Sequence, residues 1–335
     1  MRHPLLAAFA FLTVACGGPQ ATAADLPAPL HLPVASHEVT RVLALDPGIT
    51  ATIVAPARLD TTRRVDLIIY ALPNGNSTAE TIGGLAADGV GWRYDIQHIG
   101  AQTRALRARG VDQAVVAYVE ADRKSWPEWR RRHGYDRANA RIVSAVDELR
   151  AAIGNPPRLA VTLTGHSGGG SFIFGFIDGA GALPGWLERI AFLDANYSYE
   201  PRHAAKLTDW LRADDAHTLV VVAYDDRNIM LDGKRVVSDS GGTWRASHRM
   251  LADLAAPLEL VGDTLGDFRR HHDAQVEILL HPNPENRILH TELVGEMNGY
   301  MHAMLLHRPG YGDAHSVLKR ERVYGSFVEP VRFDR

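Results

Sequence analysis

One serine in this chain stands in a setting suited to covalent chemistry. It is the central residue of Gly165-His166-Ser167-Gly168-Gly169, which matches the pattern G-x-S-x-G. A serine hydroxyl is a weak nucleophile, so it must be presented in the open beside a base, with N–H donors ready for the oxyanion that it creates. Glycines on either side remove Cβ atoms that would collide in a sharp strand-to-helix turn. The pattern predicts that Ser167 is the nucleophile and that the backbone N–H of Gly168 donates to the oxyanion.

The motif alone is weak evidence, because such a string arises by chance in roughly one chain in ten of this length. The segments on either side of it strengthen the prediction. Residues 158–164 are rich in β-branched and apolar types and predict a buried strand that ends at the motif. Residues 171–177 are apolar and predict a helix that begins just after it. A glycine-rich turn that holds a phosphate is the alternative, but the lysine of a Walker loop is missing.

The elbow and the order of the surrounding elements resemble the α/β-hydrolase superfamily over residues 65–302. The resemblance implies an α/β fold with a mostly parallel eight-stranded sheet and helices on both faces. It also implies that nucleophile, acid and histidine follow in that order along the chain, each near the end of a strand.

The histidine of the family lies in a loop after the last strand. Residues 288–294 have a strand-like composition, and His302 follows them behind Gly299, so His302 is the predicted general base. His290 lies inside the predicted strand, and His307 lies further along the chain.

Three aspartates are candidates for the acid that orients the histidine. Asp226 fits the family pattern after the penultimate strand best and is the first choice. Asp225 is its neighbour, and a register error of one residue would exchange the two. Asp194 ends the preceding strand, a position that some members of the family use instead.

A second oxyanion donor comes, in this family, from the loop after the third strand. That loop is residues 73–77 here, and the resemblance assigns the role to the backbone of Asn74 or Gly75. The loop lacks the His-Gly-Gly-Gly run of many esterases, and an ordinary turn is the alternative interpretation.

Short β-branched runs alternate with helical patterns along the rest of the chain, which is typical of a mostly parallel sheet covered on both faces. Strands are predicted at residues 39–45, 52–55, 65–72, 111–119, 158–164, 189–193, 218–224, 276–280 and 288–294. Helices are predicted at 95–109, 136–153 and 245–254. The pattern breaks over 227–273, where we expect a lid or an excursion over the site.

The N-terminus reads as an export signal. Three residues with a basic Arg2 precede a mostly apolar run over 4–15, which is too short to span a bilayer, and the run ends at Cys16. The sequence therefore predicts a lipoprotein signal peptide over 1–16 with lipidation of Cys16, a flexible tether over 17–37 and a hydrolase domain over 38–335. The predicted location is the cell envelope, anchored to a membrane by the N-terminal lipid alone, and a soluble periplasmic or secreted product is the alternative.

Composition limits the partners. The chain has 335 residues, 46% of them hydrophobic, and a net charge of −3 without a basic stripe, so a nucleic-acid partner is not expected. Cys16 is the only cysteine, which excludes an internal disulfide. The local run His271-His272-Asp273 matches no metal motif, and we predict neither a metal nor a cofactor.

These features together predict a serine hydrolase that forms an acyl-enzyme on Ser167, with a carboxylic ester as its small-molecule or acylated substrate. The same residues would serve a peptidase or amidase. A protein of another class, a membrane-tethered binding protein on an inactive hydrolase scaffold, is the third alternative.

Overall fold

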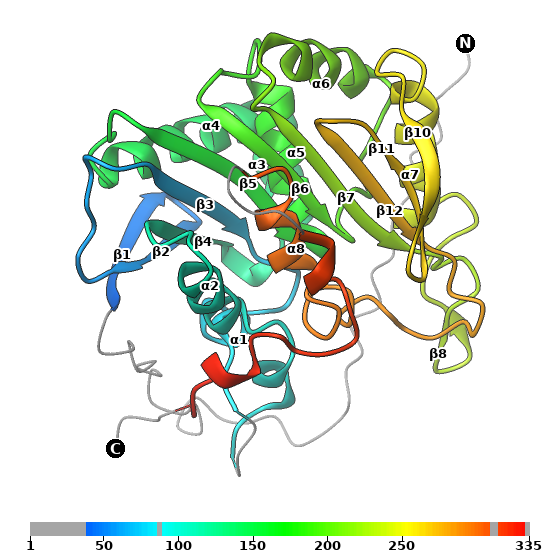
Figure 1. Cartoon of the computed structure of the whole chain (residues 1–335), viewed down its shortest axis with the longest axis horizontal. Helices are drawn as coiled ribbons and strands as arrows, with labels where there is room; N and C mark the ends of the chain where they lie inside the picture. Colours follow the sequence, from blue (N-terminus) through cyan, green and yellow to red (C-terminus); the bar gives the residue numbers. More distant parts are fainter. Residues whose placement is uncertain (1–37, 86–88, 309–313, 332–335) are drawn as a thin grey trace. The chain divides into compact units, whose positions relative to one another are not determined.

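A ten-stranded sheet forms the centre of the fold in the computed structural model, which describes residues 38–85, 89–308 and 314–331 (Figure 1). The strand order is β1-β2-β4-β3-β5-β6-β7-β12-β11-β10. The strands are β1 (Glu38–Asp46), β2 (Ile49–Pro56), β3 (Val65–Ala71), β4 (Ala114–Ala121), β5 (Leu159–His166), β6 (Leu187–Leu193), β7 (Thr218–Tyr224), β10 (Val261–Leu265), β11 (Phe268–His272) and β12 (Val276–His281). A separate hairpin joins β8 (Met230–Leu231) to β9 (Lys234–Arg235).

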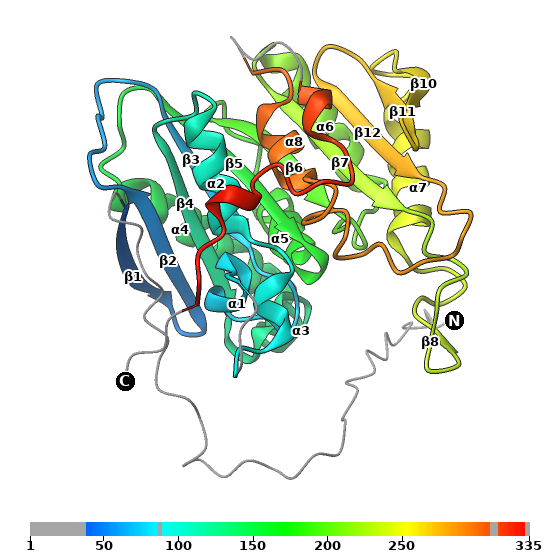
Figure 2. The same ribbon diagram turned by 60° about the horizontal axis from the view of Figure 1, so that its bottom comes forward.

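The six central strands, β4, β3, β5, β6, β7 and β12, run parallel to one another. Antiparallel pairs flank them: β2 and β1 on one side, and β11 and β10 on the other. Figure 2 shows the two edges, with β1 in blue at one side and β10 in yellow at the other. The fold is therefore mixed α/β with a mostly parallel sheet, as expected, but the sheet has ten strands instead of eight.

Helices cover both faces of the sheet, which is why its central strands are buried along almost their whole length and are mostly apolar. The helices are α1 (Thr78–Ile82), α2 (Ile99–Ala108), α3 (Trp126–His133), α4 (Tyr135–Ala152), α5 (Gly170–Gly179), α6 (Arg202–Ala213), α7 (Thr243–Leu254) and α8 (Gly299–Leu305). Short 3-10 turns add η2 (Trp92–Asp95), η3 (Asp122–Lys124), η4 (Ser167–Gly169), η5 (Ala314–Val317) and η6 (Gly325–Phe327).

Two hydrophobic cores result, one on each face. Helices α3, α4, α5, α6 and α7 lie on one face, and α2 and α8 lie on the other (Figure 1). The buried side chains of each group form one of the two cores. Neighbouring residues of one strand alternate between the two cores, so Ile278 belongs to the first core and Leu279 to the second.

Two segments differ from the expectation. Residues 227–273 were expected to form a lid or an excursion; the β8–β9 hairpin in this segment is separate from the large sheet, but α7 packs on one face and β10 and β11 join the sheet, which accounts for the two additional strands. Residues 288–294 were expected to form a strand, but they form turns, with the N–H of Leu293 donating to the carbonyl of Leu289. Three of the apolar residues that suggested a strand, Leu289, Leu293 and Val294, are buried in the core beside α2 and α8, whereas Ile288 is exposed.

The predicted signal peptide, the lipidation site Cys16 and the tether lie outside the described residues. Within the part of the chain that the structure describes, no helix combines the length and the apolar character needed to cross a bilayer.

Candidate active site

Ser167 stands on a strained turn between β5 and α5. Its φ of 53° lies in the left-handed region, where a residue with a Cβ atom is disfavoured. Its side chain is partly exposed, whereas His166 and Gly168 on either side are buried. The turn therefore lifts the hydroxyl out of the core, which is the presentation that a nucleophilic serine requires.

The glycines around Ser167 are there because the backbone of other elements passes close by. A Cβ atom on Gly165 would lie 2.8 Å from the carbonyl oxygen of Ala71 in β3, and a Cβ atom on Gly169 would overlap the same oxygen. A Cβ atom on Gly170 would overlap the carbonyl oxygen of Ala195. None of the three glycines has a positive φ, so close approach of backbone, not chain flexibility, requires glycine at these positions.

The parallel register brings Asp194 to the same edge of the sheet as Ser167. His166 pairs with Leu193 across β5 and β6, so the residues that follow them, Ser167 and Asp194, leave the sheet side by side. The carboxyl ends of parallel strands form the edge at which α/β folds place their binding sites. Asp194 also has a positive φ, 46°, and its carboxylate is fully buried.

His290 pairs with Asp194. Its Nδ1 lies 2.5 Å from Oδ2 of Asp194, and about a quarter of the histidine side chain is exposed. Because Nδ1 is held by the carboxylate, Nε2 is the nitrogen left to act on a substrate or on a neighbouring hydroxyl. This is the relation between acid and base in a serine triad.

His166 fixes the position of His290 beside the elbow. Its Nε2 lies 2.9 Å from the carbonyl oxygen of His290, and the two imidazole rings are 4.3 Å apart. Burial lowers the pKa of His166 well below its usual value, so the ring is neutral and donates a hydrogen bond from Nε2. The residue next to Ser167 in the chain thus holds the loop that carries His290.

Asp226, the predicted acid, is buried close to Asp194, but no hydrogen bond joins it to a histidine among the residues that the structure describes. Its Oδ2 accepts a hydrogen bond of 2.8 Å from the N–H of Thr243, and the hydroxyl of Thr243 donates to Oδ1 of Asp194. Burial and the charge of Asp194 raise the pKa of Asp226 to about 7. Thr243 therefore links the two carboxyl groups, and only Asp194 contacts His290.

Asp225, the other predicted alternative, is paired elsewhere. Its carboxylate accepts from the guanidinium of Arg227 at 2.6 Å, and this interaction helps to hold its pKa below the usual value against the effect of burial. Its N–H donates to the carbonyl of His281.

His302, the predicted base, lies at a different place on the sheet. It is fully buried in α8, and its Nε2 is 2.6 Å from Oε1 of Glu277. Glu277 is the second residue of β12, about 13 Å of strand before the carboxyl end, given about 3.3 Å per residue. The structure therefore places His302 away from the Ser167 edge and brings His290 to it, through the contact with Asp194.

The oxyanion loop lies against the elbow. The side chain of Asn74 packs so closely on Gly168 that a Cβ atom there would overlap Oδ1 of Asn74. The N–H of Gly75 donates to the carbonyl of Lys124 at 2.9 Å, so it is not free to serve an oxyanion. Of the predicted donors, the N–H groups of Gly168 and Asn74 are therefore the candidates that remain.

Comparisons with known proteins find only distant structural similarity. No protein-family model and no curated protein matches the chain. Among solved structures, it is similar to an uncharacterised protein from Capnocytophaga ochracea, with 14% identity and a TM-score of 0.48, over 81% of this chain and 64% of that protein. It is also similar to a cold-adapted esterase from an Arctic intertidal metagenomic library, with 11% identity and a TM-score of 0.40, over 84% of this chain and 94% of the esterase.

A third similar structure is esterase 2 of Thermogutta terrifontis, with 10% identity and a TM-score of 0.41, over 82% of this chain and 95% of that protein. The chain spans 64% of the length of the Capnocytophaga protein. At these identities and TM-scores the similarity assigns no activity to this chain.

Sequence reasoning missed two residues of the candidate site and misplaced a third. His166 occupies the variable position of the motif, and Thr243 lies in the segment that was expected to be a lid. His290 was placed inside a strand. A signal for His290 did exist: the strand pattern at 276–280 is followed by Pro282 and Pro284, which end a strand and begin a loop.

One further group of side chains could hold a metal ion among the described residues: Glu277, His302 and His315. The two imidazoles hold the pKa of Glu277 at about 2 despite its burial.

Proposed function

We propose that this protein is a serine hydrolase in which Ser167 is the nucleophile, His290 the general base and Asp194 the acid. The observation that carries the proposal is the 2.5 Å contact between Nδ1 of His290 and Oδ2 of Asp194, at the edge of the sheet where the strained turn presents Ser167. A buried carboxylate in that position fixes the tautomer of the imidazole and stabilises the imidazolium that forms during the reaction.

In the proposed reaction, His290 first accepts a proton and later donates it. Nε2 of His290 takes the proton of the Ser167 hydroxyl as Oγ attacks the substrate carbonyl, and the N–H groups of Gly168 and Asn74 donate to the oxyanion. The tetrahedral intermediate then collapses, and His290 gives the proton to the leaving group. Water, activated by the same imidazole, cleaves the acyl-enzyme and restores Ser167.

We propose a carboxylic ester as the substrate. The alcohol of an ester leaves more readily than the amine of an amide, so an ester needs less from the enzyme than the triad and the two N–H donors supply. Cleavage of amides by the same residues is the competing outcome, and a substrate panel with matched ester and amide pairs separates the two.

Thr243 is proposed as a positioning residue. Its hydroxyl donates to Oδ1 of Asp194, the oxygen that His290 does not use, while its N–H donates to Asp226. Both oxygens of Asp194 therefore have a hydrogen-bond partner, which holds the buried carboxyl group in one orientation.

Paired histidine variants test the assignment of the base. Ser167→Ala and His290→Ala should each lower kcat for a p-nitrophenyl ester by about a thousandfold or more, because the members of a triad act as a unit. His302→Gln should keep kcat within a few-fold of wild type once the rates are normalised to the folded fraction. A normal kcat in His290→Ala, or a thousandfold loss in folded His302→Gln, would overturn the assignment.

Paired aspartate variants test the acid. Asp194→Asn should lower kcat by about 10⁴-fold, because an amide favours the wrong tautomer of the histidine. Asp225→Asn is the matched control, since its carboxylate pairs with Arg227 and not with a histidine. A fluorophosphonate probe provides an independent measurement: it should label wild-type protein at Ser167, and failure to label the folded protein would contradict the hydrolase proposal itself.

We also propose that the mature protein is anchored in a membrane of the cell envelope through lipidated Cys16. The proposal rests on the basic start, the short apolar run and the position of the single cysteine in the sequence.

A further inference from the structure

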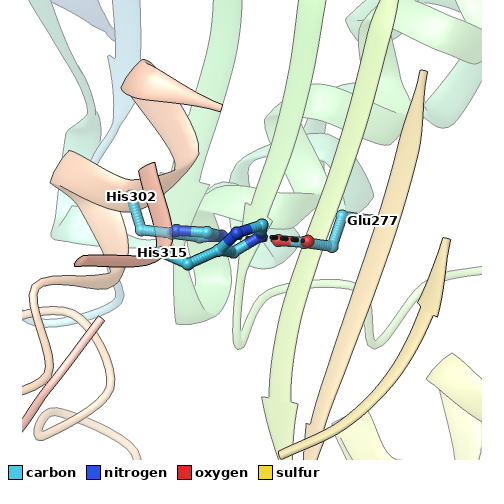
Figure 3. Close-up of side chains that lie close together, drawn as sticks. All are labelled: Glu277, His302 and His315. Atoms are coloured by element: carbon cyan, nitrogen blue, oxygen red, sulfur yellow. Dashed lines mark hydrogen bonds and ion pairs between the residues drawn. The ribbon is translucent and has the colours of Figure 1, made fainter. Parts of the chain in front are cut away.

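A buried carboxylate meets two imidazoles on the face of the sheet that α8 covers (Figure 3). Oε1 of Glu277 lies 2.6 Å from Nε2 of His302, and Oε2 lies 2.7 Å from Nε2 of His315. One possible ligand atom from each of the three residues lies within 4.8 Å of the other two. Figure 3 shows both rings pointing at the carboxylate from the same side.

Three separate elements supply these side chains. Glu277 comes from β12, His302 from α8 and His315 from η5. His302 lies 25 positions after Glu277 in the sequence, and His315 lies 38 positions after it. No short sequence motif therefore indicates the group. This explains why a search for short ligand spacings predicted no metal.

Burying ionisable side chains costs free energy unless hydrogen bonds, ion pairs or a bound ion compensate for the lost water. The side chains of Glu277 and His302 are 2% and 0% exposed, whereas that of His315 is 29% exposed. The site is therefore closed on the sheet side and open toward His315, where an ion could enter. One cation competes for the carboxylate: Nη1 of Arg270 lies 3.8 Å from Oε2 of Glu277.

We propose that Glu277, His302 and His315 bind a divalent transition-metal ion, with Zn²⁺ as the preferred class. Two imidazole nitrogens and one carboxylate are a donor set that suits Zn²⁺, and three protein ligands leave a fourth position for water. Harder ions such as Ca²⁺ and Mg²⁺ favour sites made of oxygen atoms alone, so they fit this set less well.

Binding requires a small opening of the group. At metal–ligand distances of about 2.0–2.2 Å in a tetrahedron, neighbouring ligand atoms lie about 3.4 Å apart. The contact between the coordinating carboxylate oxygen and its own imidazole would widen by about 0.7 Å, and the second imidazole would move to the same spacing from that oxygen. The nitrogens that now face the carboxylate would face the ion through their lone pairs, with the ring protons on Nδ1. A neutral histidine makes this change by tautomerisation, and a protonated one releases a proton.

The bound ion would cross-link two C-terminal segments of the chain to the sheet. It would join α8 and η5 to β12, near the start of that strand and away from the edge at which Ser167 is presented. The site is thus distinct from the proposed hydrolase centre, and metal binding is expected to be independent of Ser167.

Equilibrium binding of Zn²⁺ to the purified full-length protein tests the proposal. After removal of bound metal with a chelator, competition against a chromophoric indicator should give one high-affinity Zn²⁺ per chain. His315→Ala and Glu277→Gln should each weaken that affinity by at least about tenfold, since each removes one of three ligands. His248→Gln, on an exposed part of α7, is the matched control and should bind as wild type does.

Anomalous scattering at the zinc edge from Zn²⁺-soaked crystals gives the location directly. A peak among the three side chains would support the site, whereas a peak elsewhere only, or no high-affinity binding, would overturn it. Equal affinity in wild type, His315→Ala and Glu277→Gln would also overturn it. Ser167→Ala should bind Zn²⁺ normally, so failure of the hydrolase proposal and failure of the metal proposal give different results.

Discussion

Asp226 should make the protein less stable as the pH rises from 5 to 8, and Asp226→Asn should remove this effect. The pKa of Asp226 is raised from its ordinary value of 3.8 to about 7 by burial and by the charge of Asp194. Between these two pH values the unfolded chain has lost the proton that the folded protein keeps, so unfolding releases a proton and becomes more favourable with rising pH. Above about pH 7 both states are ionised and the penalty is constant.

The size of the effect follows from the shift. About three pH units at about 1.4 kcal/mol each give a full penalty of about 4 kcal/mol at pH 8. At pH 5 only the first part has developed, about 1.5 kcal/mol, so about 2 to 3 kcal/mol should appear between pH 5 and pH 8. The asparagine variant has no such term, although its amide adds a constant cost where Oδ1 of Asp226 has no hydrogen-bond partner among the described residues.

Urea unfolding at pH 5 and pH 8 measures this difference. The unfolding free energy of Asp226→Asn relative to wild type should rise by about 2 to 3 kcal/mol between the two pH values, and the constant cost cancels in that comparison. Asp225→Asn is the control, because the lowered pKa of Asp225 places its titration below pH 5. A relative stability of Asp226→Asn that stays flat, or falls, with rising pH would refute the reasoning.

Three other outcomes are expected. Thr243→Val should lower kcat about tenfold or more with little change in KM, and Thr243→Ser should restore it, because only the hydroxyl reaches Asp194; steady-state kinetics on an ester decide this. Gly170→Ala should destabilise the fold by about 3 kcal/mol or more, measured by urea unfolding, since its Cβ atom would overlap the carbonyl of Ala195 and backbone must move. Cys16→Ser should move the protein from the membrane fraction to the soluble fraction, and retention in membranes would count against lipidation.

The elements that local patterning defines were predictable from the sequence. The central strands contain apolar runs because both faces of the sheet are covered. The glycines on either side of Ser167 predicted the sharp turn there. The expected edge strands over 39–45 and 52–55 are present as the antiparallel pair β1 and β2. In each case neighbouring residues alone determine the element.

The base could not be placed in the same way. Residues 288–294 contain enough apolar side chains for a strand, but turns, and not a strand, bury three of them in the core beside α2 and α8. Tertiary packing decided the conformation, and the error moved the expected histidine loop from His290 to His302. The choice among the aspartates depended on the same loop, since the acid is whichever carboxylate the histidine reaches.

The geometry around the elbow shows how His290, the proposed base, is held near Ser167 although the two residues are far apart in the sequence. His166 is joined to Ser167 by a peptide bond and to the carbonyl of His290 by a hydrogen bond. One residue therefore links the serine to the loop that carries His290. That hydrogen bond needs a proton on Nε2 of His166, and burial keeps the ring neutral while Nδ1 has no partner among the described residues. In the proposed site, the position of His290 relative to Ser167 therefore depends on His166, the variable residue of the motif. A serine motif with a different residue at that position would require another contact to hold its histidine loop.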